Sequence, residues 1–192
     1  MYHIKSDKRS RSSALRFVRG LQECLQTMPL ASITVSDLHR VTSLSRATFY
    51  RLFDTPEDIL VYQMDQMTAD AARVYAANST LSTAQLLERT ISLGLENHTF
   101  VRALMDNHRL DLLYRSTEEV FRQLDSGHVV FSGSMDPQER EYLISYLSMM
   151  LVATQIAWSR NGYQDTSDQL MKHMRTFVRT MGELLGDPEA EP

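Results

Sequence analysis

A run of side chains near the beginning of the chain carries groups that suit the surface of a nucleic acid. Arg46 and Thr48 have donors and acceptors that can pair with base edges, and the methyl group of Ala47 can pack near a thymine methyl. Tyr50 and Arg51 follow, with a hydroxyl and a guanidinium that suit phosphate oxygens. The residue types and their spacing therefore predict a contact surface for DNA.

Two short helices joined by a turn would hold these residues in place. Residues 33–53 read ITVSDLHRVTSLSRATFYRLF. Thr34 can cap a first helix from Val35 to Val41, and Ser45 can cap a second helix that carries the contact residues. The hydroxyls of Thr34 and Ser45 are also candidate phosphate contacts. This arrangement is typical of a helix-turn-helix, whose second helix enters the major groove.

Charge is divided unevenly along the chain. The 192 residues carry a formal net charge of −4. Residues 1–53 hold nine Lys and Arg against three acidic residues, a balance of +6, whereas residues 54–192 hold eleven against 21, a balance of −10. A basic head on an acidic body turns the head toward phosphates. The early basic residues that we expect to reach the DNA backbone or a groove are Lys8, Arg9 and Arg11.

Helical spacing runs through nearly the whole sequence, without strand alternation or an internal repeat. The chain is therefore predicted to be all-α, with about nine helices. Breaks are expected at about 78–82 and 126–136. The expected helices occupy about residues 10–27, 35–41, 45–53, 56–77, 82–97, 99–107, 110–126, 137–160 and 166–185.

One segment, Tyr142 to Ser159, contains no charged residue over 18 positions and is long enough to suggest a membrane span. Its polar residues are Ser145, Ser148, Thr154, Gln155 and Ser159. Because such groups are costly in lipid, a helix buried between protein surfaces is the better interpretation. The beginning of the chain lacks the apolar segment of a signal peptide. We therefore expect a cytoplasmic protein that does not contact a membrane.

The sequence contains no pattern typical of an enzyme or a metal site. It has no phosphate-binding glycine loop, nucleophile motif or dinucleotide fingerprint, and its six histidines include no pair at i, i+4 spacing. We expect no catalysis, no cofactor and no bound metal. Cys24, the single cysteine, lies among apolar positions and is interpreted as a small buried side chain, with a redox-sensing thiol as the alternative.

The helix-turn-helix stretch resembles the N-terminal domain of the TetR family of bacterial transcription regulators. The residues that carry the resemblance are Thr34-Val35, Asp37-Leu38, Leu44-Ser45-Arg46, Thr48-Phe49-Tyr50 and Phe53, followed by an acidic helix start after Pro56. Where the family commonly has Ala-Gly in the turn, this chain has Thr42-Ser43, so Ser43 would hold a backbone geometry that glycine adopts more cheaply. The resemblance implies a DNA-binding head of residues 1–55 and an effector-binding and dimerisation body of residues 56–192.

The same resemblance implies a homodimer that binds a pseudo-palindromic double-stranded DNA operator, most often as a repressor, and that a small-molecule effector releases. A lone helix-turn-helix makes too few contacts for operator-level affinity, so DNA recognition needs the dimer. We expect the helix at 137–160 and the last helix to pair with those of a second subunit as a four-helix bundle. The predicted interface residues are Leu147, Leu151, Leu170, Met174, Phe177, Met181 and Leu184.

Family analogy also places an effector cavity among the helices between residues 85 and 160. The residues expected to line it are Leu95, His98, Phe100, Met105, Tyr114, Phe121, Met150 and Trp158. A different interpretation is a helical protein-interaction module, or an effector-independent regulator, with the same fold and no ligand pocket. The presence and volume of a cavity in the body separate the two interpretations.

Overall fold

The computed structural model describes residues 1–76, 82–126 and 135–186. Within these ranges the chain forms nine α-helices and one short 3-10 helix, which confirms the all-α prediction. The breaks expected at 78–82 and 126–136 lie largely outside the described residues. The elements are α1 (Lys8–Leu25), η1 (Leu30–Ser32), α2 (Val35–Thr42), α3 (Arg46–Leu52), α4 (Glu57–Ala76), α5 (Thr83–Glu96), α6 (His98–Asp106), α7 (Leu110–Ser126), α8 (Pro137–Arg160) and α9 (Ser167–Leu185).

Both predicted caps of the helix-turn-helix are confirmed. At the beginning of α2 the hydroxyl of Thr34 accepts the backbone N–H of Asp37, and the Asp37 carboxylate accepts the backbone N–H of Thr34. This reciprocal pair satisfies two N–H groups that the first turn of a helix leaves without partners. At the beginning of α3 the hydroxyl of Ser45 accepts the backbone N–H of Thr48. The local sequence therefore determines where both helices start.

Side-chain caps also set the beginnings of four other helices, α1, α5, α8 and α9. α1 starts at Lys8 rather than at Ser10, because the carboxylate of Asp7 accepts the backbone N–H of Ser10. The sequence analysis overlooked this cap. The predicted starts of α8 and α9 are confirmed, since the side chains of Asp136 and Thr166 each accept backbone N–H groups in the first turn.

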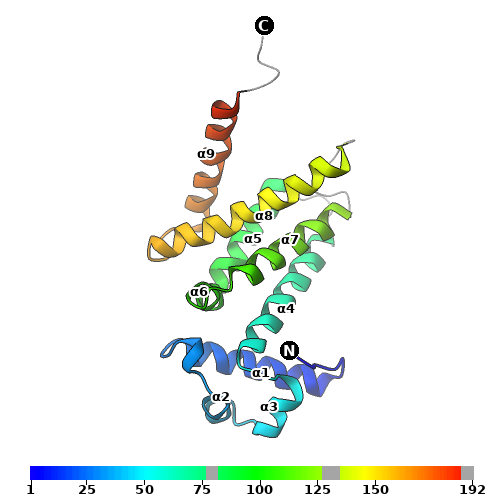
Figure 1. Ribbon diagram of the computed structural model, residues 1–192, viewed down its shortest axis with the longest axis vertical. Coiled ribbons are helices and arrows are strands. Elements are labelled where there is room, and N and C mark those ends of the chain that lie inside the picture. The colour runs from blue at the N-terminus through cyan, green and yellow to red at the C-terminus, as the bar shows by residue number, and fades with distance from the viewer. Residues whose placement is uncertain (77–81, 127–134, 187–192) are drawn as a thin grey trace.

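The molecule consists of a head and a body stacked along its long axis (Figure 1). α1, α2 and α3 form the head, α4 runs from the head into the body, and α9 projects beyond the body at the end opposite the head. Buried side chains of the head, such as Phe17 and Phe49, belong to the same hydrophobic cluster as Val101 and Leu113 of the body. Head and body therefore share a core, and the division expected after residue 55 stays a prediction.

An aromatic cluster fixes α3 relative to α1 and α4. The ring of Phe17 meets the ring of Phe49 edge to face with centroids 5.4 Å apart, and it meets that of Phe53 in the same way at 6.0 Å. Phe53 in turn contacts Tyr62 of α4 with ring centroids 6.0 Å apart. The three phenylalanines are completely buried, at 0% exposure. Because edge-to-face contacts favour particular ring angles, this cluster sets the orientation of α3 in the head.

The turn between α2 and α3 holds Ser43 in the left-handed region, with φ 56° and ψ 21°. This confirms that Ser43 adopts a geometry that glycine would adopt more cheaply. Two side chains brace the turn. Arg16 donates from Nη2 to the carbonyl oxygen of Thr42 at 2.5 Å, and Nδ1 of His39 lies 2.6 Å from the carbonyl oxygen of Leu44. Contacts from side chains therefore support a turn that lacks a glycine.

α8 is the uncharged helix expected from the sequence. By length and composition alone it could cross a membrane, and it is the one such helix within the described part of the chain. In the structure it packs in the body and buries Ile144 and Leu151. Its hydroxyl side chains are satisfied within the helix, because Ser148 donates to the carbonyl oxygen of Ile144 at 2.7 Å and Thr154 donates to that of Met150 at 2.8 Å. α8 is therefore packed on the body on one side, while Tyr142, Tyr146 and Met149 are exposed on another.

The corner between α8 and α9 sets the direction of the projecting α9. The indole Nε1 of Trp158 donates to the carbonyl oxygen of Asp165 at 3.1 Å, and Nδ2 of Asn161 donates to the Asp165 carboxylate at 2.7 Å. Gly162 lies in the corner with φ 64°, a conformation that favours glycine. These contacts hold α9 at a defined angle to the body.

Replacing Ser43 by glycine should stabilise the fold. Glycine removes the Cβ crowding of the left-handed conformation, so we expect the free energy of unfolding to rise by about 0.5 kcal/mol after the entropy cost of glycine is subtracted. A matched Ser12→Gly variant at an exposed position of α1 should lower it by about 0.5 kcal/mol. Urea unfolding followed by circular dichroism measures both, and equal destabilisation by the two variants would contradict the account of the turn.

Candidate nucleic-acid interface and ligand cavity

α3 lies at the outer end of the head (Figure 1), and most of its predicted contact residues are exposed. The exposed side chains are those of Arg46, Ala47, Tyr50 and Arg51, with Thr48 half-buried. Phe49 and Leu52 on the opposite face are buried in the core. Tyr50 is 58% exposed although its ring contacts that of Phe49, with centroids 5.3 Å apart. The buried face of α3 therefore anchors a polar face that is open to a ligand.

A side chain of α2 holds the guanidinium of Arg46. Nη2 of Arg46 donates to Oγ of Ser36 at 2.8 Å, and both side chains are exposed. The hydrogen bond brings the beginning of α2 beside the beginning of α3 on one surface. The sequence analysis missed Ser36. One feature of the sequence could have indicated it, because Ser36 lies in the first turn of α2, two residues after the cap residue Thr34.

Two of the four candidate phosphate contacts, Thr34 and Ser45, are engaged as helix caps. Oγ1 of Thr34 donates to Oδ2 of Asp37 at 2.5 Å, and the bonds from Thr34 hold the pKa of Asp37 below its ordinary value. Oγ of Ser45 lies 2.9 Å from Oγ1 of Thr48. Thr34 and Ser45 are nevertheless exposed, so their contact with phosphate stays a prediction.

The basic residues at the beginning of the chain lie in the first turns of α1. They are Lys8, Arg9 and Arg11, and all three are exposed. The segment that precedes them runs beside the end of α3. The backbone N–H of His3 donates to the carbonyl oxygen of Leu52 at 2.8 Å, and Tyr2 forms an isolated bridge with Phe53. Residues 2 and 3, which precede the basic residues in the chain, are therefore bonded to the end of α3.

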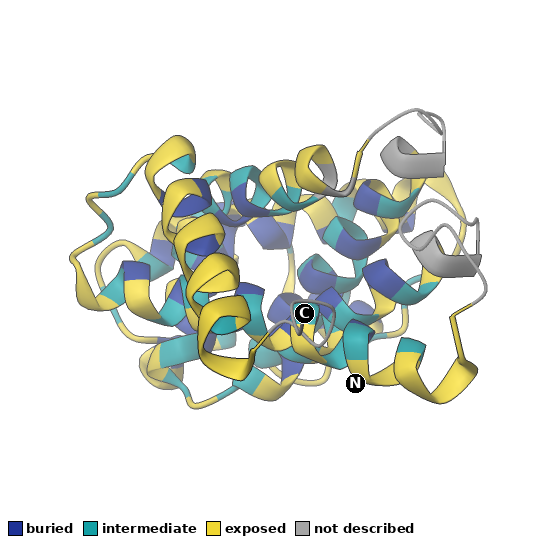
Figure 2. Ribbon diagram, turned by 90° about the horizontal axis from the view of Figure 1, so that it is seen from above, coloured by how far each residue is buried: buried dark blue, intermediate teal, exposed yellow. Residues whose placement is uncertain are grey.

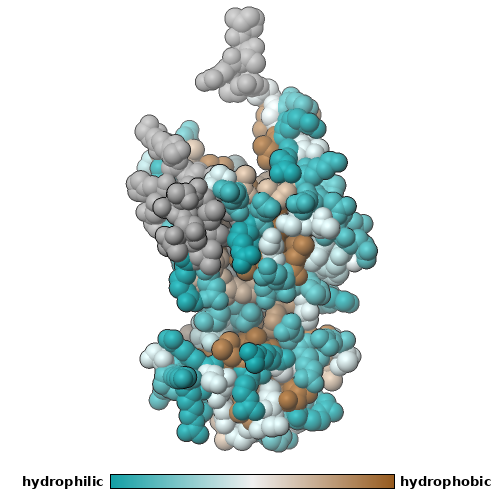
Figure 3. Space-filling view, turned by 180° about the vertical axis from the view of Figure 1, so that it is seen from behind, coloured by the Kyte–Doolittle hydropathy of each residue, from teal (hydrophilic) through white to brown (hydrophobic). Residues whose placement is uncertain are grey.

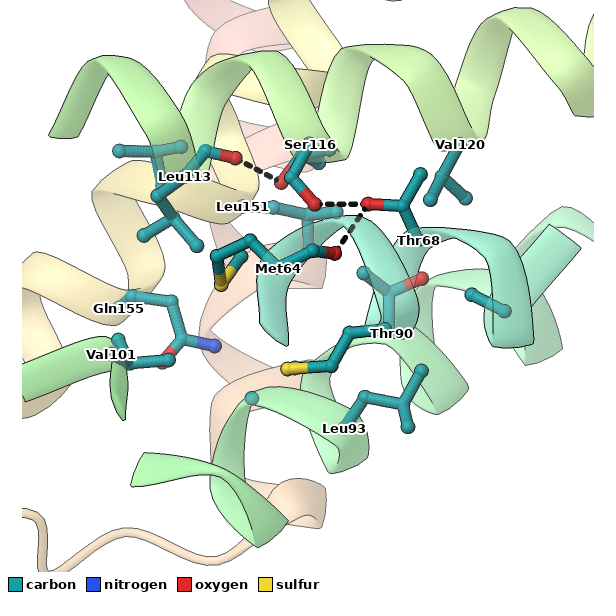
Figure 4. A pocket seen from close by; sticks show the side chains of 15 residues that line it. Met64, Thr68, Thr90, Leu93, Val101, Leu113, Ser116, Val120, Leu151 and Gln155 are labelled. Carbon is teal, nitrogen blue, oxygen red and sulfur yellow. Dashed lines mark hydrogen bonds between the residues drawn. The ribbon is translucent and has the colours of Figure 1, made fainter. Parts of the chain in front are cut away.

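The body contains a partly open cavity of 60 Å³ between α4, α5, α6, α7 and α8 (Figure 4). Most of its lining is apolar, a few hydroxyl and amide groups reach it, and none of its lining residues is charged. The lining residues are Met64, Met67, Thr68, Ala71, Thr90, Leu93, Gly94, Val101, Leu113, Ser116, Thr117, Val120, Leu151, Val152 and Gln155. The structure thus contains a cavity in the region where the sequence analysis expected one.

The predicted lining residues are corrected, because none of the eight lines this cavity. Phe100 and Phe121 fill the hydrophobic core. His98 lies in a surface groove between the end of α1 and α6, and Met150 and Trp158 lie in another groove where α8 meets α9. The remaining predicted residues, Leu95, Met105 and Tyr114, are half-buried against the core. Phe100 and Phe121 were selected from the sequence as large aromatic side chains, but in the fold they fill space instead of lining the cavity.

Two polar features lie in the cavity wall (Figure 4). Oγ1 of Thr68 donates to the carbonyl oxygen of Met64 at 2.9 Å and shares a short hydrogen bond with the hydroxyl of Ser116. Gln155 enters from α8 and is 6% exposed, and its Oε1 has no hydrogen-bond partner among the described residues. Because buried polar groups are nearly always paired, this oxygen requires an explanation.

The residues predicted for a subunit interface fall into three sets, which are buried, exposed and half-buried. Leu151, Leu170 and Met174 are buried in the core of the chain itself, which corrects their assignment to an interface. The first half of α9 packs on the body, so its apolar face is already covered there. Phe177 at 52% and Leu184 at 74% are exposed, and both belong to the later part of α9. This helix projects from the body (Figure 1) and is largely exposed (Figure 2). The half-buried members are Leu147 and Met181.

Further exposed apolar residues lie on the same two helices. They are Tyr142, Tyr146 and Met149 on α8 and Val178 and Leu185 on α9. The rings of Tyr142 and Tyr146 stack with centroids 6.2 Å apart. The space-filling view shows apolar surface on the projecting helix (Figure 3). The sequence analysis missed the residues on α8, because a helix that is apolar all round does not indicate which of its faces is buried.

No group of three His, Cys, Asp or Glu side chains within the described ranges is arranged to hold a metal ion. Cys24 is buried in the core of the head, and burial raises the pKa of its thiol. The thiolate is the reactive form of cysteine, so a raised pKa makes this side chain a poor nucleophile. The structure therefore favours the packing role over the redox-sensing role.

Comparison with known families gives one match. The family profile described as "Transcriptional regulator C-terminal region" matches residues 82–180. No curated protein matches the chain in sequence. The profile covers the helices that enclose the cavity from α5 onward and most of α9, so it concerns the body.

Solved structures are similar to both parts of the chain. The "Dihydroxyacetone kinase operon activator DhaS" has a TM-score of 0.68 at 14% identity, covering 90% of this chain and 97% of that one. A TetR transcriptional regulator from Streptococcus agalactiae 2603V has 0.60 at 17% identity, with 88% and 94% covered. The fatty acid degradation regulator FadR from Bacillus halodurans has 0.54 at 11% identity, with 91% and 96% covered. At such identities the similarity shows a common fold.

Proposed function

Because the chain belongs to the TetR family of transcription regulators, we propose that it binds double-stranded DNA as a homodimer and regulates transcription. The observation that carries the proposal is the polar face of α3, where Arg46 and Arg51 are exposed opposite the completely buried Phe49. In this proposal residues 1–55 bind the operator, and residues 56–192 bind an effector and the second subunit.

α3 is the helix that we assign to the major groove. Arg46 and Thr48 read base edges there, and Ala47 packs near a thymine methyl. Arg46 exchanges its hydrogen bond with Ser36 for one with a base, so Ser36 keeps the guanidinium ordered until DNA arrives. The residues assigned to phosphates are Thr34, Ser45, Tyr50 and Arg51, and those assigned to the backbone or a groove are Lys8, Arg9 and Arg11.

The second subunit pairs with α8 and with the projecting half of α9. This proposal is supported by exposed apolar side chains on both helices, among them Tyr146, Phe177 and Leu184. Two copies related by a two-fold axis would bury these faces as a four-helix bundle. The same symmetry would present two copies of α3 to half-sites roughly 34–36 Å apart, which is one turn of DNA.

We propose that the protein is a non-enzymatic, cytoplasmic repressor that a small effector releases from its operator. α4 connects the cavity to the head. Met64 and Thr68 of this helix line the cavity. Ile59 and Leu60, one to two turns earlier, are completely buried in the core that head and body share. A ligand that favours one position of α4 would therefore change the spacing of the two heads. Release requires that the ligand bind the two conformations with different affinities.

Replacing Arg46 by alanine should relax sequence preference. Loss of a bidentate base contact is expected to cost about 1–3 kcal/mol on the preferred operator and much less on DNA with a different base at that position. Arg51→Ala, a matched change on the same helix, should weaken binding to all sequences alike and reduce its salt dependence. Fluorescence anisotropy with cognate and substituted duplexes at several salt concentrations measures both effects. Full discrimination by the Arg46 variant would refute its assigned role.

Replacing Phe177 by aspartate should separate the subunits. The side chain is exposed within the chain, so the fold should persist, but a charge in an apolar interface is expected to cost about 2 kcal/mol per subunit and to weaken the dimer roughly a thousandfold. Leu15→Asp, at a 46% exposed position of α1, is the control and should leave the dimer intact. Sedimentation velocity measures the oligomeric state of both variants. If the Phe177 variant remained a dimer, the interface would have to lie elsewhere.

A further inference from the structure

We infer that the cavity in the body binds a small uncharged molecule with an apolar body and one hydroxyl or amide group, and that the side-chain amide of Gln155 forms a hydrogen bond with that group. The role of this molecule as the regulatory signal rests on the proposed function. Its binding does not, because that claim depends only on the cavity and its lining.

Gln155 differs from the other polar residues of α8. The hydroxyls of Ser148 and Thr154 donate to carbonyl oxygens one turn earlier in the helix, which satisfies them without any ligand. Oε1 of Gln155 can only accept, and the described residues offer it no donor. Figure 4 shows the side chain reaching from α8 into the space between the apolar residues. Figure 4 also shows the nitrogen of this amide turned toward the cavity, so a hydroxyl or amide group on a bound molecule would give the side chain a hydrogen-bond partner.

Gly94 of α5 provides the space for this amide. A Cβ added at Gly94 would lie 2.1 Å from Nε2 and 3.0 Å from Cδ of Gln155. Both distances are too short for non-bonded atoms, so any larger residue at position 94 would displace the amide. The pairing of a glycine on α5 with a glutamine on α8 therefore fixes where the amide lies in the cavity.

The lining also limits the charge and the size of the molecule that the cavity can hold. None of the lining residues is Asp, Glu, His, Lys or Arg, so a carboxylate or an ammonium group would lose its hydration without gaining a counter-charge. The volume of 60 Å³ is below the roughly 150 Å³ of an engineered cavity that binds benzene. Met64 and Met67 line the cavity with flexible side chains that can adjust to an occupant. The molecule is therefore neutral and has few heavy atoms.

A titration with three probes of equal chain length tests this class. 1-Butanol, butyrate and butylammonium are added separately to the full-length protein labelled with carbon-13 at the methionine methyl groups. We expect saturable shifts of the Met64 and Met67 methyl resonances with 1-butanol and none with either ion. Shifts that grow linearly in all 11 methionines would indicate a solvent effect, and equal binding of butyrate would show that charge is not excluded. Either result would overturn the inference.

Two substitutions test the role of the Gln155 amide in binding. Gln155→Leu should weaken 1-butanol binding about tenfold, the value of one hydrogen bond. Gly94→Ala should weaken it as well, because the added Cβ displaces the amide, and this second variant keeps the test decisive if Gln155→Leu fails to fold. Gln138→Leu, at an exposed position in the first turn of α8, is the control and should bind 1-butanol normally. Unchanged affinity in both cavity variants would refute the assignment of Gln155.

Operator binding measured on the same samples keeps the two proposals separate. Saturable 1-butanol binding in a protein that binds no DNA would leave the ligand class standing and remove its regulatory role. DNA binding with no saturable shift from 1-butanol would overturn the cavity inference and leave the proposed function intact. A cavity that holds only ordered water would give the second result.

Discussion

The packing of Phe17 against Phe49 and Phe53 is the interaction on which the rest of the head depends. These rings come from α1, from α3 and from the residue that follows α3, and all three are completely buried. Truncating such a residue to alanine typically costs about 3–5 kcal/mol, whereas a whole domain is stable by only about 5–15 kcal/mol. The polar face of α3 can therefore keep a fixed orientation only while this cluster is intact. The two helix caps and the braced turn at Ser43 refine a geometry that the rings establish.

The same cluster continues into the body, so it connects the DNA-binding head to the part of the molecule that contains the cavity. Tyr62 of α4 contacts Phe53, and Met64, two residues later on the same helix, lines the cavity. An ion pair between Arg109, just before α7, and Glu57 ties the beginning of α4 to the body as well. α4 therefore belongs to both parts of the molecule, and a change in its position at the cavity would be transmitted to the aromatic cluster. This coupling is physical, because one rigid helix is packed at both sites.

The head could be predicted from the sequence because its geometry depends on local chemistry. Thr34 and Ser45 cap the helices that follow them, and Ser43 occupies the left-handed position that the turn requires. The cavity could not be predicted in this way, since Gly94 and Gln155 meet only when α5 packs beside α8. α8 carries apolar residues on all sides, so its sequence did not separate the buried Leu151 from the exposed faces. One signal was available, because Gln155 is the single amide in an uncharged stretch of 18 residues.

The central claim is that two copies of α3 read DNA together, and selection of bound sequences from a random pool tests it most directly. Duplexes with a randomised segment of about three helical turns are incubated with the protein at physiological salt, recovered and sequenced over several rounds. The account predicts enrichment of an inverted repeat whose two half-sites are centred about one helical turn, or a multiple of it, apart. Sequences that remain random after selection, or enrichment of a single isolated half-site, would contradict it.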